Sequence, residues 1–322
     1  MIDTLRVQLS GISFGEAFKN WLLGEYPDAR FIQSSYAPGL SWDACSIKDK
    51  KLGTLGIRSS RAGNVLTAER SIGKYLNDDN AALLTAKEAV EGASAWLSDL
   101  VLRFTGWWEL SDPLATARVR RIDLCYQKAY ESSSEVFPYI HAALNARRAT
   151  IFECLAPGRD GSKGILDLPK LQVYLSGVTY NKNRWEHTRW YDKGIESGNE
   201  MFLNVVRHEE EIKGGYAGYV AQIVDGRFCC DREKARDRMN ERYEGWGQGE
   251  VYDFGKLLSE HGKTGAAAIG MVLHPEYETL YKQHLSQQMF YRIRAVVMEA
   301  RKLRVPVNLR LPEDAWLDSE VL

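Results

Sequence analysis

The chain has 322 residues, of which 44% are hydrophobic and 26% are charged, and its formal net charge is −1. This length allows one large or two modest domains with a sizeable core. The near-neutral charge argues against a protein that coats nucleic acid without selectivity, because such proteins are strongly basic.

The first part of the chain shows the patterns of a mixed α and β protein. Apolar residues alternate at the N-terminus, which predicts a strand, and residues 14–23 are predicted to form a helix. Apolar residues at helical spacing predict a long helix over 81–104. A further helix is expected near 136–146. Strands are predicted at 41–48, 53–60, 64–70, 118–126, about 149–154, 170–177, 186–193 and 201–213.

The pattern changes after Gly226. Residues 231–243 are charged and helical, and helical periodicity returns at about 251–260, 264–272 and 275–303, with Pro306 and Pro312 ending the last helix. We therefore predict an α+β fold, with an antiparallel sheet flanked by helices over residues 1–226. Residues 227–322 are predicted to form a smaller, basic and mostly helical C-terminal region.

The cysteine content and the length of the apolar segments indicate the cellular compartment of the protein. Five cysteines show no zinc-type spacing, and their odd number does not suggest a disulfide framework. The N-terminus does not resemble a secretory signal, and no apolar run approaches the roughly 20 residues that span a bilayer. The sequence thus predicts a cytoplasmic protein with reduced thiols and no membrane partner.

Two predicted strands carry acidic residues that could hold a metal ion. In the strand 118–126, Arg121, Asp123 and Cys125 share one face, and in the strand 203–212, Glu209 shares a face with Arg207 and Glu211. A carboxylate in mid-strand is costly unless it is solvated, paired or bound to metal. Asp123 and Glu209 suit Mg²⁺ or Mn²⁺. The alternatives are an Asp123 paired with a neighbouring arginine and a solvated Glu209–Glu211 face.

The strand 186–193 presents Tyr191, followed two residues later by Lys193. A tyrosine hydroxyl beside a cation can attack phosphorus, and the lysine can stabilise the charge that develops on the phosphate. Lys193 shares the face of Tyr191 if the strand continues. Most of the sixteen tyrosines must be packing residues, and rival nucleophiles near Tyr191 are Tyr180, Tyr216 and Tyr219. His187 and His208 are open candidates for the metal site.

Several arginines are candidates for contacts with the phosphates of DNA, the substrate that a phosphorus-attacking tyrosine could act on. Basic residues exceed acidic ones between Lys282 and Arg310, and a helix there could grip phosphates while Phe290, Tyr291 and Met298 pack inward. A solvated amphipathic helix would look the same. The candidate DNA-binding residues are Arg121, Arg189 and Arg207 on the strands, and Arg292, Arg294 and Arg301 near the C-terminus.

At these residues the chain resembles the replication initiators of filamentous bacteriophages (inoviruses), the gene II-type endonucleases. Order and spacing agree over most of the first 220 residues. The shared segments are Met1-Ile2-Asp3-Thr4-Leu5, Arg121-Ile122-Asp123, Val178-Thr179-Tyr180-Asn181, Tyr191 with Lys193 and Glu196, and Val206-Arg207-His208-Glu209 through Ile212-Lys213.

The resemblance implies a specific reaction. Tyr191 corresponds to the family's nucleophile and Lys193 to its companion, while the metal role is carried to Asp123 and Glu209 by position. Such an enzyme nicks one strand at a double-stranded origin, keeps the 5′ phosphate on its tyrosine and later rejoins the displaced strand. Its partners are the origin DNA, the nicked single strand, and a host helicase and DNA polymerase.

The chain also departs from the family. The segment from Leu66 to Gly73 lacks the Gly-His-Asn of familiar members, His208 replaces a phenylalanine, and the sequence beyond about residue 226 matches only loosely. Origin recognition is more affected by these differences than chemistry. A non-catalytic, origin-binding regulator of replication is the alternative. A relaxase-type transfer enzyme ranks lower, because such enzymes use a histidine cluster and no His-x-His pair exists here.

Overall fold

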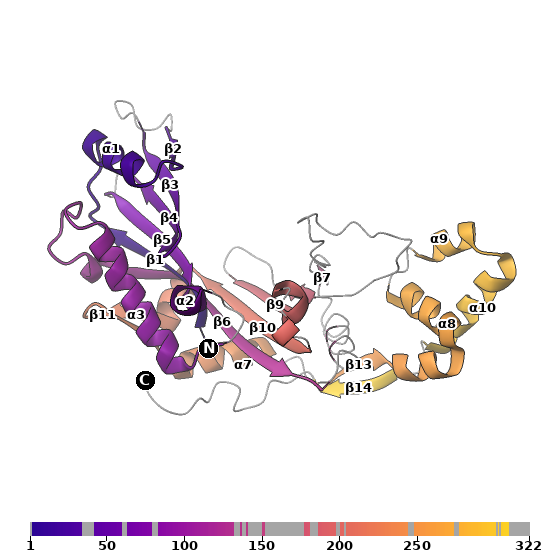
Figure 1. Cartoon of the computed structure of the whole chain (residues 1–322). Helices are drawn as coiled ribbons and strands as arrows, with labels where there is room; N and C mark the ends of the chain where they lie inside the picture. The colour runs from indigo at the N-terminus through magenta and orange to yellow at the C-terminus, as the bar shows by residue number, and fades with distance from the viewer. Residues whose placement is uncertain are drawn as a thin grey trace.

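A computed structural model describes residues 2–33, 42–59, 63–78, 83–131, 136, 140, 150–151, 177–180, 186–197, 200–202, 204–243, 248–273, 277–300, 302 and 304–308. In this part of the chain, ten antiparallel strands form one sheet in the order β2-β3-β4-β5-β1-β6-β10-β9-β8-β7 (Figure 1). The strands are β1 (Ile2–Ser10), β2 (Arg30–Ile32), β3 (Ala44–Asp49), β4 (Gly53–Arg58), β5 (Val65–Ser71), β6 (Arg118–Ala129), β7 (Thr150–Ile151), β8 (Gly177–Tyr180), β9 (Glu186–Asp192) and β10 (Val205–Lys213).

Helices and two small sheets complete the described elements. The helices are α1 (Glu16–Glu25), α2 (Ile72–Asn77), α3 (Ala86–Arg103), α5 (Lys193–Ser197), α6 (Gly215–Val220), α7 (Arg232–Tyr243), α8 (Phe254–Leu273), α9 (Tyr277–His284) and α10 (Gln287–Ala300), with 3-10 turns η1 (Pro113–Thr116) and η3 (Glu200–Phe202). The two-stranded sheets pair β11 (Ala221–Val224) with β12 (Arg227–Cys230), and β13 (Gln248–Tyr252) with β14 (Arg304–Asn308). The predicted α+β class, with an antiparallel sheet flanked by helices, is confirmed.

The hydrophobic core lies between one face of the sheet and the helices. Alternate residues of β1, including Leu5, Val7 and Leu9, are fully buried, as the alternating pattern predicted. The predicted helix over 81–104 is α3, which begins at Ala86 because a capping box joins Thr85 and Glu88. In Figure 1, α3 runs along the left side of strands β1, β4 and β5. One face of these strands is therefore buried in the hydrophobic core.

Several sequence predictions require correction in the C-terminal part. The helix expected over 275–303 is two helices, α9 and α10. The segments expected at about 251–260 and 264–272 are joined in α8, which kinks at Gly262, except that Val251 and Tyr252 belong to β13. Pro306 does not follow a helix directly. It lies in β14, where a two-stranded ribbon tolerates a residue without an N–H group.

The division at residue 226 stays a prediction. The β11–β12 hairpin crosses it, and the backbone N–H of Phe228 donates a hydrogen bond to Ser94 Oγ of α3 (3.1 Å). Figure 1 shows α8, α9 and α10 at the far end of the molecule from α1. The strands that precede and follow these helices in the chain, β13 and β14, pair with each other.

Other predictions fall partly beyond the described residues. Most of the helix near 136–146, most of the strand 170–177, Cys154 and Arg301 lie outside the described residues. None of the four described cysteines forms a disulfide. Within the described chain, no helix combines the length and apolar character needed to cross a membrane.

Candidate active site

Three neighbouring strands bring the predicted site residues together. The order β6-β10-β9 places Asp123, Glu209 and Tyr191 on adjacent strands. Glu209 lies opposite Cys125 on one side and Arg189 on the other, and Arg207 lies opposite Tyr191. Directly opposite residues point to the same face of a sheet. The three predicted residues therefore share one face of the sheet.

Tyr191 is in direct contact with Glu209. Its hydroxyl donates a hydrogen bond to Glu209 Oε2 at 2.9 Å, although only 8% of Tyr191 is exposed. Burial raises the pKa of Tyr191 well above its ordinary value, and the nearby Glu209 carboxylate raises it further. The phenol is thus neutral at rest, and its proton already faces a carboxylate.

Asp3 and Cys125 complete a buried group around Glu209. One ligand atom from each of Asp3, Cys125 and Glu209 lies within 4.8 Å of the others. Ser71 Oγ donates to Asp3 Oδ1 (3.1 Å), and Nη1 of the fully buried Arg207 lies 4.0 Å from Asp3 Oδ2. Burial raises the pKa of Asp3, and repulsion from Glu209 adds to this shift. We call Asp3, Cys125, Tyr191 and Glu209 the Tyr191 site.

Asp123 has a different partner. The Arg121 guanidinium donates from Nε to Asp123 Oδ1 (2.7 Å) and from Nη2 to Oδ2 (2.5 Å), so the carboxylate is held from both oxygens. Burial still raises the pKa of Asp123 well above its ordinary value, although the hydrogen bonds from Arg121 lower it. The pairing with a neighbouring arginine, considered from the sequence, is therefore present. A metal role for Asp123 stays a prediction.

The acidic run is not a solvated face. Glu209, Glu210 and Glu211 are 3%, 0% and 5% exposed. Glu210 accepts a hydrogen bond from Thr188 on the other face of the sheet. Glu211 lies near Arg121 and Lys213, and although burial alone would raise its pKa, hydrogen bonds from His187 and Lys213 lower it to about 2. Buried carboxylates at this density are typical of a functional site.

The two histidines lie on opposite faces. The His208 ring is tilted against the rings of Trp190 and Tyr126, and burial lowers its pKa to about 3, so it is neutral on the face away from Glu209. His187 shares the face of Glu211, with its Nδ1 3.6 Å from Glu211 Oε2. His208 is thus excluded from the Tyr191 site by strand geometry.

Lys193 lies near Tyr191, but it belongs to a helix and not to the strand that was expected to continue through it. The strand ends at Asp192, and Lys193 begins α5 instead of continuing β9. Its ammonium nevertheless lies 5.9 Å from the centre of the Tyr191 ring and 2.5 Å from Glu196 Oε2. Only 1% of Lys193 is exposed, so its charge acts in a shielded environment.

The predicted DNA-binding arginines divide into two groups. Arg121 and Arg189 pair with buried carboxylates of the sheet, and Arg207 is buried beside Asp3. These three side chains neutralise the site. Arg292 and Arg294 lie on the exposed side of α10, where Arg294 Nε is 3.5 Å from Glu278. Phe290 packs inward as predicted.

Two predicted inward contacts of α10 are wrong. Tyr291 and Met298 are exposed, because the helix instead buries Ile293, Val296 and Val297. Of the rival nucleophiles, Tyr216 and Tyr219 are exposed on α6 with Arg238 and Lys234 over their rings, and Tyr180 lies in β8.

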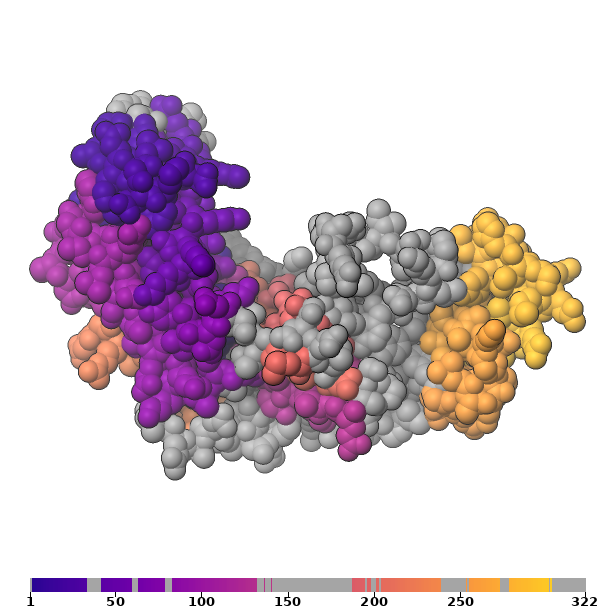
Figure 2. Space-filling view, viewed as in Figure 1, coloured from indigo at the N-terminus to yellow at the C-terminus, as the bar shows by residue number. Residues whose placement is uncertain are grey.

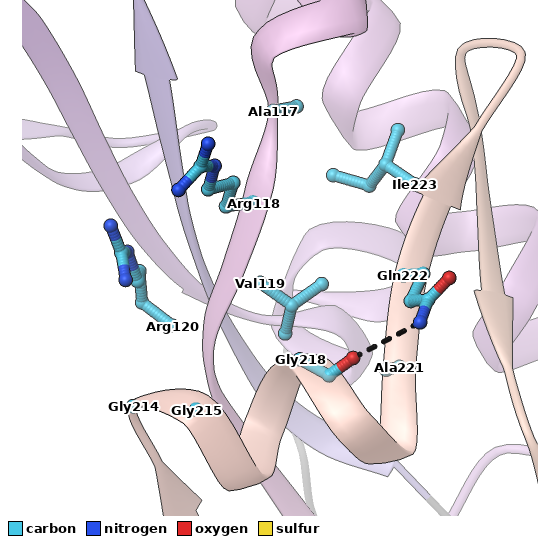
Figure 3. Close-up of a pocket in the computed structure, with 10 residues that line it drawn as sticks. All are labelled: Ala117, Arg118, Val119, Arg120, Gly214, Gly215, Gly218, Ala221, Gln222 and Ile223. Carbon is cyan, nitrogen blue, oxygen red and sulfur yellow. Dashed lines mark hydrogen bonds between the residues drawn. The ribbon is translucent and has the colours of Figure 1, made fainter.

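A pocket of about 390 Å³ lies elsewhere, between the start of β6 and the α6–β11 segment (Figure 3). Its lining includes Val119, Gly214, Gly218 and Ile223 and no residue of the Tyr191 site. A second group with metal-ligand chemistry, Glu260, His261 and Glu299, is partly exposed and contains a His261–Glu299 contact of 3.2 Å. The residues that line the pocket include no carboxylate and no tyrosine, and exposed acidic groups are common without a bound ion, so neither feature competes with the Tyr191 site.

The chain shows only a weak similarity to known proteins. No protein-family model matches the chain, and no curated protein matches its sequence. One similar solved structure is the rolling circle replication initiator protein from Geobacillus stearothermophilus, with 11% identity and a TM-score of 0.28. The superposition covers 74% of this chain and 77% of that one. A TM-score this low does not establish a common fold.

Proposed function

We propose that the chain is a DNA nicking and joining enzyme that initiates rolling-circle replication, with Tyr191 as its nucleophile. The observation that carries the proposal is the hydrogen bond from the Tyr191 hydroxyl to Glu209 inside a buried acidic group. An ordinary packing tyrosine does not require several buried charges around it, and maintaining them is costly unless they serve a reaction.

The residues around Tyr191 divide the work of the reaction. Glu209 accepts the phenolic proton as the Tyr191 oxygen attacks phosphorus, so an O–P bond forms while the bond from phosphorus to the 3′ oxygen breaks. The 3′ oxygen leaves as a hydroxyl after taking a proton, and the 5′ phosphate stays on Tyr191. Lys193 lies 5.9 Å from the ring and stabilises the negative charge that develops. In the reverse step, a 3′ hydroxyl attacks the phosphotyrosine and loses its proton to water, the bond from phosphorus to the Tyr191 oxygen breaks, and that oxygen takes its proton back from Glu209, which restores the DNA strand.

The donor set fits a hard divalent ion. Asp3 and Glu209 supply carboxylate oxygens, which Mg²⁺ and Mn²⁺ prefer. Burial raises the pKa of Cys125 well above its ordinary value, so its thiol stays protonated and is a poor ligand for such an ion. We therefore propose Asp3, in addition to Glu209, as a metal ligand. The ion would polarise the scissile phosphate when bound.

The test is whether a covalent adduct forms on Tyr191. The full chain is incubated with Mg²⁺ and supercoiled circular DNA of the replicon that encodes it, and products are resolved under denaturing conditions. We expect relaxed circles and a protein–DNA adduct whose phosphotyrosine maps to Tyr191 by mass spectrometry. An adduct on Tyr180, Tyr216 or Tyr219 would contradict the assignment, and binding without nicking would favour the non-catalytic regulator.

The carboxylates give a separate prediction. Asp3→Asn should raise the Mg²⁺ concentration that supports half-maximal nicking by at least about tenfold, because it removes one anionic ligand. Asp123→Asn is the matched control, since Asp123 is also buried on the same face but is held by Arg121. A metal titration of nicking rate measures both variants. If only Asp123→Asn raised the requirement, the metal role would return to Asp123 as the sequence predicted.

A further inference from the structure

The sheet has a polar face that runs from β2 across β6 to the end of β10, and most of its residues take no part in the proposed reaction. Directly opposite residues on neighbouring strands form continuous rows across it. One row runs through Lys48, Thr54, Glu69, Arg6, Arg121 and Lys213, and a second runs through Arg30, Ser46, Gly56, Thr67, Gln8 and Arg118. A third contains Ile32, Ala44, Arg58, Val65 and Ser10.

Hydrogen bonds and burial show that these rows share a face opposite the core. Arg6 and Arg121 both bind Glu69 of the first row, and Arg120 Nε donates to Gln8 Oε1 of the second at 2.8 Å. Alternating residues of the same strands, such as Leu55, Ile57 and Leu66, are buried in the core. Figure 3 shows Arg118 and Arg120 projecting from β6 to the same side, away from α6 and β11.

Positive charge dominates this face. We call Arg30, Lys48, Arg58, Arg118 and Arg120 the basic face; the first four are exposed, and none of those four makes an ion pair with another residue that the structure describes. The rows contain a single acidic residue, Glu69, which is already neutralised by Arg6 and Arg121. The sheet therefore presents an uncompensated set of cations to solvent.

The shape of the face indicates which anion it suits. Ser46, Gly56 and Thr67 are small and lie in the middle of the second row, with arginines at both ends, so a broad ligand can lie flat between the charges. The rows contain no aromatic side chain, whereas surfaces that bind unpaired strands use aromatic rings to stack bases. Spaced cations without stacking rings are suited to the phosphates of a duplex.

The basic face is continuous with the Tyr191 site. The first row ends at Arg121 and Lys213, and both belong to the strands that carry Asp123 and Glu209. In Figure 2 the indigo and purple N-terminal part of the surface rises as an arm. Nucleic acid that lies along the sheet can therefore extend from this arm toward Tyr191 without leaving one face.

We propose that the basic face binds the phosphate backbone of duplex DNA beside the position of the nick. The identity of the nucleic acid rests on the proposed function, whereas the location of the contact rests on the strand register and charge of the sheet. The sequence suggested DNA contacts both on the strands and in the C-terminal helix, and this proposal assigns duplex binding to the N-terminal sheet.

The test measures the salt dependence of duplex binding. Lys48→Ala, Arg58→Ala and Arg118→Ala are combined in the full-length Tyr191→Phe chain, so that cleavage does not interfere, and binding to a fluorescent duplex of arbitrary sequence is followed by anisotropy. Each lost phosphate contact lowers the slope of log affinity against log salt by about 0.9, so the slope should fall by about 2 to 3. A matched control, Lys87→Ala with Arg227→Ala and Lys263→Ala, removes three exposed positive charges elsewhere and should change it by less than about 1.

Each other outcome overturns the proposal. An unchanged slope, or an equal fall in the control, removes the basic face from DNA binding. A full loss of slope with Arg292→Ala and Arg294→Ala, but not with the triple variant, returns the contact to α10. If the triple variant loses binding to a single strand but keeps the duplex, the occupant is an unpaired strand. Because anisotropy needs no cleavage, failure here is distinct from failure to form the Tyr191 adduct.

Discussion

Tyr191→Phe should abolish nicking and adduct formation while the fold and duplex binding remain. The substitution removes one oxygen, and the ring that fills the site stays in place. Loss of a covalent nucleophile has cost on the order of 10⁶-fold in rate where it has been measured, so activity should fall below detection. The measurement is conversion of supercoiled to relaxed circles together with the denaturation-resistant adduct.

The result is informative because the substitution also removes a buried hydrogen bond. Glu209 Oε2 loses the Tyr191 donor, although Arg189 still contacts the other oxygen of this carboxylate. A modest loss of stability, about 1 to 3 kcal/mol, is therefore expected from the hydrogen bond alone. Exposed Tyr216→Phe is the matched control and should keep full activity. Nicking that persisted in Tyr191→Phe would place the nucleophile elsewhere.

Local patterns in the sequence predicted the parts of the site that lie within one strand. The period of two placed Arg121, Asp123 and Cys125 on one face of β6, and the structure confirms this because β6 keeps a regular pleat from Arg121 onward. The same reasoning separated Glu209 from His208. Tyr191 and Glu209 were predicted individually, and their contact follows from the pairing of β9 with β10.

The pairing of strands that are far apart in the chain could not be predicted from the sequence. Asp3 reaches Glu209 only because β1 lies between β5 and β6, and irregular register between Ile2 and Leu5 displaces the strand beside β6. No periodicity within residues 2–10 reveals a partner more than 100 residues away. The basic face was missed for the same reason, because its rows exist only once six strands are aligned. The colours in Figure 1 show that strands far apart in the sequence lie side by side in this sheet.

Replacing Arg121 should produce the largest loss of stability among these variants. Asp123 is fully buried, and Arg121 supplies both hydrogen bonds to its carboxylate. Arg121→Met would leave that charge buried without its partner, which typically lowers the free energy of unfolding by about 3 to 5 kcal/mol. Chemical denaturation of the purified chain measures the difference. Arg118→Met, an exposed arginine in the same strand, should change stability by less than about 0.5 kcal/mol.

A second substitution distinguishes the loss of stability caused by the unpaired Asp123 charge from the loss caused by the missing contacts of Arg121. In Arg121→Met with Asp123→Leu no unpaired carboxylate remains, so most of the lost stability should return. Burial already raises the pKa of Asp123, and without Arg121, which lowers it, the pKa rises further. Protonation then removes the buried charge, so the deficit of Arg121→Met should be smaller at mildly acidic pH than at neutral pH. If the double variant were as unstable as the single one, Arg121 would stabilise the sheet through its contacts with Glu69 and Glu211 and not through Asp123.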